Sequence, residues 1–247
     1  MSPGGGPGRR RGALASPGPE VNGAGGGLTA PAGGRAVRRN RNKGQPTVFA
    51  TGSGYSFTQL SERRPRAYWF TGFLTAKECE ELVKGYEKKV DGAGVLQLPD
   101  KGTRLLDERK DEVSNWLMVP PQFSEDVWWL VRVEAGGELP ALPEVNRVGS
   151  KGGTLQRLAT VLLFLTTPGG GEVVFTEAEE DVTSASCGKA GLVVRPEKGG
   201  ALLEWHVDLQ ALDDPVVAKQ AYCPVTAGPQ WVLVKRYFTE EISYLGR

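Results

Sequence analysis

Histidine is nearly absent from this chain of 247 residues, which contains a single one and only three cysteines. This shortage argues against a zinc cluster built from these residues and against a disulfide framework. We expect Cys79, Cys187 and Cys223 to be buried or partly buried free thiols. The alternative is one disulfide with one cysteine left over, so cysteine use does not decide the redox compartment.

Long apolar runs are also missing. None approaches the roughly 20 residues that cross a bilayer, so no transmembrane segment is expected. The most apolar stretch, Ala159–Leu165, has the length of a strand and is interpreted as core. The formal net charge of +1 excludes a uniformly basic, nucleic-acid-coating protein, and nucleic acid is not expected as a partner.

Acidic residues are scarce in the first 44 residues, where Glu20 is the only one beside many Gly, Pro, Ala and Arg. This composition predicts a disordered extension over 1–44, a linker over 45–67 and a folded domain over 68–247. The extension is interpreted as a solvated tail, with an organelle transit peptide and an RNA- or anion-binding tail as alternatives. No signal-peptide core is seen, and the localisation is left unknown.

Apolar spacing predicts helices and strands in different parts of the domain. Helices are expected over 76–89, where Thr75 and Glu78 form a capping box, and over 125–133. From residue 155 onward, Gly and Pro turns separate short apolar runs. The expected strands are Leu158–Leu165, Glu172–Phe175, Gly191–Arg195, Gly200–Trp205, Ala221–Val225 and Gln230–Phe238. Val161, Leu163 and Leu165 should share one face, and Gly169–Gly171 should form a tight hairpin connection.

An ordered set of short motifs runs through the C-terminal half of the chain. Its members are Arg157–Leu165, Gly170–Phe175, Cys187, Gly191–Gly199, Ala201–Trp205, Asp214–Pro215, Cys223–Val225 and Gly228–Trp231. In order and spacing they resemble the prolyl 4-hydroxylases, a family of Fe(II)- and 2-oxoglutarate-dependent dioxygenases. The resemblance covers roughly residues 68–240. It implies a mainly β fold with flanking helices: a double-stranded β-helix, also called a jelly roll or cupin-like fold.

The same resemblance implies that the ligands of iron and 2-oxoglutarate are lost. The family's His-x-Asp motif precedes the segment matched by Arg157–Leu165, but residues 144–154 are too short and contain no histidine, so the fold is expected to be incomplete. The family's second metal histidine corresponds to Gln220. Its 2-oxoglutarate lysine corresponds to Gln230, and a pocket threonine to Val173. The scaffold positions Trp205, Cys223 and Trp231 match the family.

No other residue is expected to replace these ligands. His206 and Asp208 form a His-x-Asp pair, but they follow the strand that ends at Trp205, so a surface loop is the interpretation and a metal role the alternative. Lys235 should lie on the opposite face of its strand from Gln230. Arg236 should lie roughly 20 Å further along, at about 3.3 Å per residue.

These observations favour a catalytically inactive prolyl 4-hydroxylase-like protein that acts as a binding or scaffold module without cofactors. Its expected partner is a Pro-rich or extended peptide, or a protein that covers the sheet edge left by the missing strands. The alternative is an active peptidyl-proline hydroxylase whose metal-binding segment is missing from this gene model. In that case Fe(II), 2-oxoglutarate and ascorbate would be required, and the family's secretory-pathway location would be expected.

Overall fold

The computed structural model describes residues 48–50, 54–62, 64–90, 94–100, 103–143, 147–149, 155–178, 185–207, 219–240 and 242–244. The predicted extension over 1–44 lies outside these residues, as do Asp208 and the Asp214–Pro215 motif. None of the described helices is long and apolar enough to cross a membrane.

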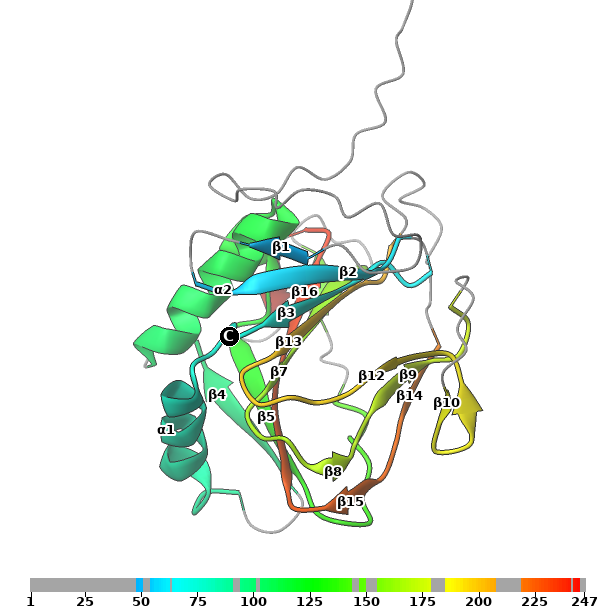
Figure 1. The fold of residues 1–247 in the computed structure, drawn as a ribbon. Helices are drawn as coiled ribbons and strands as arrows, with labels where there is room; N and C mark the ends of the chain where they lie inside the picture. Colours follow the sequence, from blue (N-terminus) through cyan, green and yellow to red (C-terminus); the bar gives the residue numbers. More distant parts are fainter. Residues whose placement is uncertain are drawn as a thin grey trace, which may run out of the picture.

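The described part of the chain is mainly β, as predicted, with two flanking α-helices (Figure 1). The helices are α1 Ala76–Tyr86 and α2 Arg104–Leu117, followed by the short 3-10 helix η1 Pro121–Phe123. The strands are β1 Val48–Ala50, β2 Ser56–Ser61, β3 Ala67–Thr71, β4 Gly94–Pro99, β5 Val127–Val133, β6 Arg147–Gly149, β7 Arg157–Phe164, β8 Gly169–Gly170, β9 Val173–Phe175, β10 Ala185–Ser186, β11 Lys189–Ala190, β12 Leu192–Val194, β13 Ala201–Trp205, β14 Gln220–Tyr222, β15 Val225–Ala227, β16 Gln230–Phe238 and β17 Ile242–Tyr244.

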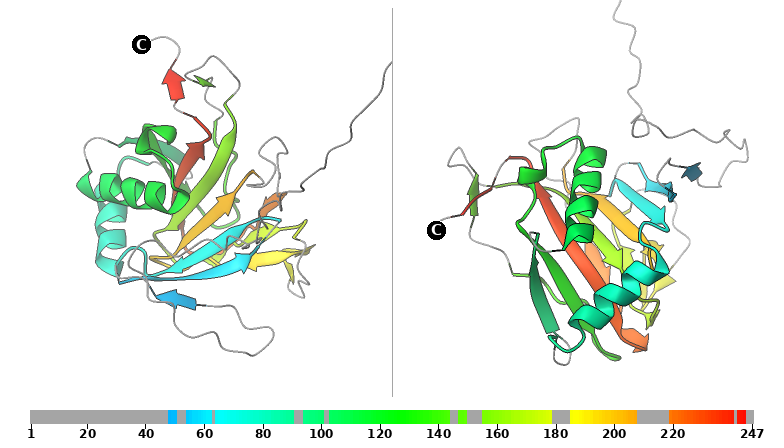
Figure 2. Two further views of the ribbon diagram at one scale, coloured as in Figure 1. Left: turned by 90° about the horizontal axis from the view of Figure 1, so that it is seen from above. Right: turned by 90° about the vertical axis from the view of Figure 1, so that its left-hand side faces the viewer.

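Eight strands form one antiparallel main sheet in the order β1-β2-β3-β13-β7-β16-β5-β4. Strand β7 lies near its centre, where Leu163 pairs with Ala201 of β13 on one side and with Leu233 of β16 on the other. A second sheet, β12-β9-β14, lies beside the main sheet, and the short pair β15-β8 lies beyond one end of it (Figure 1). Two further views show the main sheet edge-on and face-on (Figure 2).

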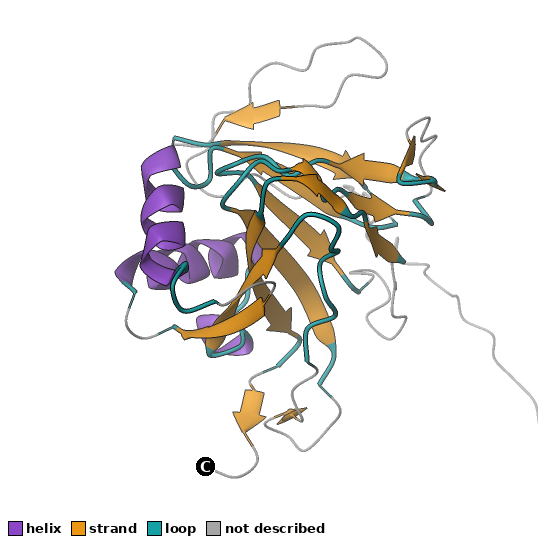
Figure 3. Ribbon diagram, turned by 90° about the horizontal axis from the view of Figure 1, so that it is seen from below, coloured by secondary structure: helices purple, strands orange, loops and turns teal. Residues whose placement is uncertain are grey.

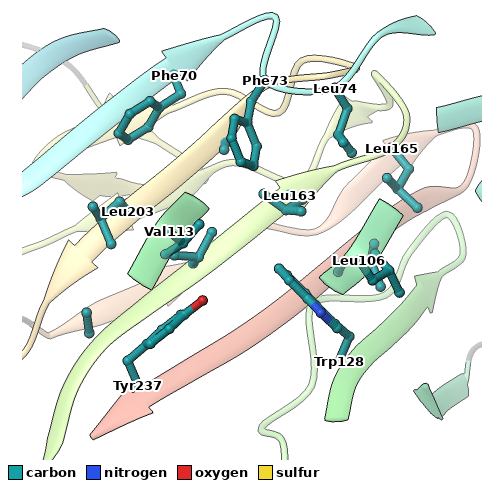
Figure 4. Packing of buried hydrophobic residues seen from close by; sticks show 14 of the residues in the cluster. Phe70, Phe73, Leu74, Leu106, Val113, Trp128, Leu163, Leu165, Leu203 and Tyr237 are labelled. Atoms are coloured by element: carbon teal, nitrogen blue, oxygen red, sulfur yellow. The ribbon is translucent and has the colours of Figure 1, made fainter. Parts of the chain in front are cut away.

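Two apolar cores lie on opposite faces of the main sheet. The helix-side core lies between the sheet and helices α1 and α2, which cover one face (Figures 3 and 4). The inter-sheet core contains side chains of both sheets, including Leu162 and Phe164 of β7 with Val173 and Phe175 of β9. This two-layer arrangement is the predicted jelly roll.

Alternation along β7 explains how one strand serves both cores. Val161 and Leu163, with Leu165 just beyond the strand, belong to the helix-side core, as predicted from their spacing. Leu162 and Phe164 point the other way, into the inter-sheet core. A strand buried on both faces therefore appears in the sequence as a continuous apolar run.

Helix α1 begins where the capping box predicted. The Thr75 hydroxyl accepts from the Glu78 backbone N–H at 3.2 Å, and the Glu78 carboxylate accepts from the Thr75 backbone N–H at 2.7 Å. Cys79 and Leu82 are the fully buried residues of this helix. Two backbone donors at the helix N-terminus are thus satisfied by the two side chains.

The helix predicted over 125–133 is wrong, because this segment forms strand β5 between β16 and β4. Trp128 and Leu130 pack into the helix-side core, whereas Trp129 and Val131 pack into the inter-sheet core. This is period-two alternation, and aromatic and β-branched residues favour it. The neighbouring helix α2 was not predicted.

The main sheet begins earlier in the chain than expected. Strands β1 and β2 lie inside 45–67, the segment interpreted as a linker, and β2 pairs with β3. The glycines at 169–170 also differ from the expected hairpin, because they form strand β8, which pairs with β15. Most of the other strands predicted after residue 155 are confirmed to within about two residues. The run predicted over 221–225 is divided between β14 and the first residue of β15.

Candidate functional site

The three positions at which the family resemblance places lost ligands lie on or beside the second sheet. Val173 lies on β9 and Gln220 on the neighbouring β14, where Gln220 pairs with Phe175. Gln230 begins β16 of the main sheet and donates its side-chain amide to the Gly171 carbonyl, just before β9, at 3.1 Å. The structure therefore places Val173 and Gln220 on neighbouring strands, and Gln230 against the residue two positions before Val173.

Gln230 is buried and its amide is engaged within the protein. Only 2% of the residue is exposed. Gly171 has a φ of +72°, and a Cβ built there would lie 2.8 Å from the Gln230 side-chain oxygen. Glycine is therefore required by both the backbone conformation and the close approach of this amide. The arrangement offers a neutral hydrogen-bonding group and no cation.

The two cations further along β16 are committed to structural contacts. Lys235 lies on the opposite face, as predicted, with its ammonium over the Trp128 ring and bonded to Asp100. Burial lowers the pKa of Lys235 to about 8. Arg236 lies on the Gln230 face but donates to the Glu125 carboxylate at 2.8 Å, so it does not replace the missing lysine.

Gln220 is also engaged by a neighbour. The Tyr222 hydroxyl donates to the Gln220 side-chain oxygen at 2.8 Å. Burial raises the pKa of Tyr222 above its ordinary range, with a further contribution from the negative charge of Glu204. The Gln220 side-chain nitrogen is buried and has no hydrogen-bond partner among the described residues. An amide oxygen that already accepts a hydrogen bond is a poor substitute for an imidazole ligand of iron.

Val173 contributes apolar surface only. It is fully buried in the inter-sheet core, and Phe175 and Val225 belong to the same core. Its position therefore supplies no polar group to a co-substrate.

His206, predicted to lie in a surface loop, is largely buried instead. Its Nε2 lies 2.7 Å from the Thr160 hydroxyl and 3.2 Å from a Glu204 carboxylate oxygen. The second Glu204 oxygen has no hydrogen-bond partner among the described residues. Sequence reasoning missed Glu204, although a carboxylate inside the apolar run Ala201–Trp205 was a signal that could have been noticed.

The residues at these positions do not fit a 2-His-1-carboxylate iron centre or a lysine-bound 2-oxoglutarate. Within the described ranges, no three His, Cys, Asp or Glu side chains are grouped so as to hold a metal ion. Asp208, the partner of His206 in the His-x-Asp pair, lies outside them. At the positions where the family resemblance places the ligands of iron and 2-oxoglutarate, the structure has two amides and an apolar side chain instead of a base and a cation.

The scaffold positions are all buried. Trp205 and Trp231 belong to the helix-side core. Cys223 forms a disulfide with Cys187, so the interpretation of three free thiols is wrong and the alternative of one bridge is right. Cys79 is the free cysteine, and burial raises its pKa to about 11.

Comparisons with known proteins agree with the resemblance noted in the sequence. No protein-family model matches the chain. Prolyl 4-hydroxylase 2 of Arabidopsis thaliana is 29% identical over 203 residues, which cover 70% of this chain and 67% of that protein. Probable prolyl 4-hydroxylase 4 of the same plant is 29% identical over 207 residues, with the same coverage of each.

The fold is similar to that of a solved viral enzyme. A truncated form of the collagen prolyl hydroxylase vCPH from Paramecium Bursaria Chlorella virus-1 has a TM-score of 0.52 and 18% identity, covering 70% of this chain and 89% of that chain. Its 2-oxoglutarate complex has a TM-score of 0.50 and covers 94% of that chain. At this identity the likeness supports the jelly-roll fold.

Proposed function

We propose, from the premise that this chain is a relative of the prolyl 4-hydroxylases, that it has lost their chemistry and acts as a binding or scaffold module. A shared fold does not establish a shared reaction, because catalysis depends on the residues of the site. The proposed activity is the binding of a peptide or protein segment, without iron and without 2-oxoglutarate.

The observation that carries this proposal is the contact between Gln230 and Gly171. The amide at the co-substrate position is buried and donates to a backbone carbonyl, and a glycine is needed to admit it. A buried carboxylate of 2-oxoglutarate would need a compensating cation there. Arg236, on the same face, is already paired with Glu125.

Gln220 supports the same conclusion independently. Its side-chain oxygen accepts from Tyr222, and its neutral amide cannot act as a strong ligand of Fe(II). Two separate positions on two strands have therefore lost the required chemistry. One missing segment in a gene model does not account for both.

A turnover assay tests the proposal. The purified full chain is incubated with Fe(II), ascorbate, 2-oxoglutarate and a Pro-rich peptide, and succinate is measured by mass spectrometry. Prolyl 4-hydroxylase 2 of Arabidopsis thaliana serves as the active control. We expect no succinate from this chain above a reaction without protein. Iron-dependent succinate above that background would overturn the proposal.

The alternative of a missing metal-binding segment has its own test. Sequencing the transcript across residues 145–154 would show whether a His-x-Asp segment is encoded there. We expect none, because Gln220 and Gln230, which lie outside this stretch, also differ from the family's ligands.

We also infer an oxidising compartment from the Cys187–Cys223 disulfide, since such bonds are rare in the cytosol. Mass spectrometry of the protein isolated from its source under alkylating, non-reducing conditions should find this pair bridged and Cys79 alkylated only after unfolding. A fully reduced pair would contradict the inference.

A further inference from the structure

One strand of the second sheet has an open edge. Strand β14 pairs only with β9 on one side, and no other described strand pairs with it. Figure 1 shows β14 at the margin of the second sheet. Strand β6, the described part of the short segment that stands in place of the family's His-x-Asp strands, pairs with β17 and not with β14.

The hydrogen-bond pattern shows which backbone groups point outward. The Cys223 N–H donates to the Glu172 carbonyl at 2.8 Å, and the Lys219 carbonyl accepts from the Thr176 N–H at 3.1 Å. Residues 219, 221 and 223 therefore face β9. Because antiparallel strands alternate, the N–H and C=O groups of Gln220 and Tyr222 point away from β9.

The edge is bounded at its C-terminal end. Val225 exchanges backbone hydrogen bonds with the Gly136–Gly137 turn, at 2.7 and 2.8 Å, which closes the edge beyond β14. Among the described residues, nothing pairs with the outward backbone groups of Gln220 and Tyr222, which form a short ladder. So short a ladder suits a single extended peptide segment better than a second copy of the chain, since stable dimers need a far larger area.

A side-chain donor beside this ladder also lacks a partner. The Gln220 side-chain nitrogen is buried without a hydrogen-bond partner, while the oxygen of the same amide accepts from Tyr222. A buried donor without a partner costs free energy that an incoming acceptor recovers. In a strand added at this edge, the residue directly opposite Gln220 has its Cβ about 5.5 Å or less away, within reach of this nitrogen.

We propose that β14 binds an extended peptide as an added strand, and that the peptide places an Asn, Asp, Gln or Glu side-chain oxygen opposite Gln220. This rests on the proposed function and states how the binding module holds its partner. The backbone ladder supplies affinity, and the Gln220 nitrogen selects the acceptor side chain.

The test begins with a random nonapeptide library displayed on phage and selected against the full chain. Enriched peptides are synthesised with a fluorescent label, and their affinities are measured by anisotropy. Gln220→Pro removes the outward N–H at an edge position where proline is tolerated. Gln220→Ala is the matched control, because it keeps that N–H and removes only the side chain. Circular dichroism and melting curves establish that both variants fold.

We expect Gln220→Ala to weaken binding about 3- to 10-fold, the value of one hydrogen bond, and Gln220→Pro, which also loses the backbone bond, about 10- to 100-fold. Replacing the peptide's acceptor residue by Leu should weaken binding to the wild type by the same 3- to 10-fold. It should have no further effect on Gln220→Ala, since the two groups form one interaction.

A second measurement does not depend on the variants. Hydrogen exchange of the wild-type chain, with and without a selected peptide, should slow at the amides of Gln220 and Tyr222. Three outcomes would overturn the inference: recovery of no binding peptide, equal affinity of Gln220→Pro and Gln220→Ala, or unchanged exchange at both amides. Self-association that protects these amides would assign the edge to a second copy instead. Succinate formation in the turnover assay would contradict the proposed loss of catalytic activity, but it would not change the result of this peptide-binding test.

Discussion

The two ends of strand β16 use polar residues in opposite ways. At its start, Gln230 places a neutral amide in the position where the family resemblance places a 2-oxoglutarate lysine. Near its end, Lys235 and Arg236 are buried cations paired with Asp100 and Glu125. The chain therefore tolerates buried charge on this strand, but only where a carboxylate of its own compensates it. The cations of β16 therefore hold the fold, and we propose that its start does not bind an anionic ligand.

The largest expected loss of stability follows a change at the end of β16 that carries Lys235 and Arg236. Glu125→Ala leaves the Arg236 guanidinium buried without its carboxylate and removes the acceptor of the Trp129 indole N–H. Breaking a buried pair in this way should lower the free energy of unfolding by about 3–5 kcal/mol, measured by urea denaturation. Glu108→Ala, which breaks an exposed pair with Arg104, is the control and should change it by less than about 0.5 kcal/mol. Equal losses of unfolding free energy in the two variants would show that the buried Arg236–Glu125 pair contributes no more to stability than the exposed pair.

The second expected effect is a dependence of the free energy of unfolding on pH. The pKa of Lys235 is lowered from 10.5 to about 8, so above pH 8 the unfolded chain binds more protons than the folded one at this group. Stability contributed by this group should therefore rise between about pH 8 and 10, by about 2 kcal/mol. The Cys79 thiol, whose pKa is raised to about 11, and the buried tyrosines Tyr222 and Tyr237, whose pKa values are also raised, lower the stability toward the upper end of this window. The contribution of Lys235 is therefore read as the difference between the wild type and a Lys235 variant.

Urea denaturation across this window measures the slope. Lys235→Met should remove the rising contribution and make the slope more negative than in the wild type, whereas Lys219→Met, at an exposed position, should leave the slope unchanged. Equal slopes from pH 8 to 10 in the wild type and in Lys235→Met would contradict the account of Lys235.

The smallest expected loss of stability follows a change at Gln230, at the start of β16. Gln230→Met removes the donor to the Gly171 carbonyl and leaves that buried acceptor unpaired, which should cost about 1–2 kcal/mol. Thermal unfolding measures it, with Gln97→Met on the exposed side of β4 as the control. A loss as large as that of Glu125→Ala would remove the contrast between the two ends of β16.

Local signals decided how much of this fold could be predicted. Strands β7, β13 and β16 follow from continuous apolar runs between Gly and Pro turns, and α1 follows from its capping box. Strand β5 was misassigned because Trp128, Trp129 and Val131 fit a helical face as well as a strand buried on both sides. Helix α2 was missed because charged residues separate its few apolar ones.

The assignment of Gln220 and Gln230 as site positions comes from the resemblance to the family motifs and stays a prediction. Their contacts could not be predicted from the sequence. The partners of these side chains depend on pairing between segments far apart in the chain, as with Gly171 and Gln230. Glu204 and its contact with His206 depend on how β13 pairs with β7, and no local pattern predicts that pairing.

Direct binding tests the central claim most simply. Isothermal titration of 2-oxoglutarate into the full chain, under anaerobic conditions with saturating Fe(II), should release no heat beyond dilution, while the Arabidopsis thaliana enzyme titrated alongside should bind. Stoichiometric, iron-dependent binding of 2-oxoglutarate by this chain would contradict the account.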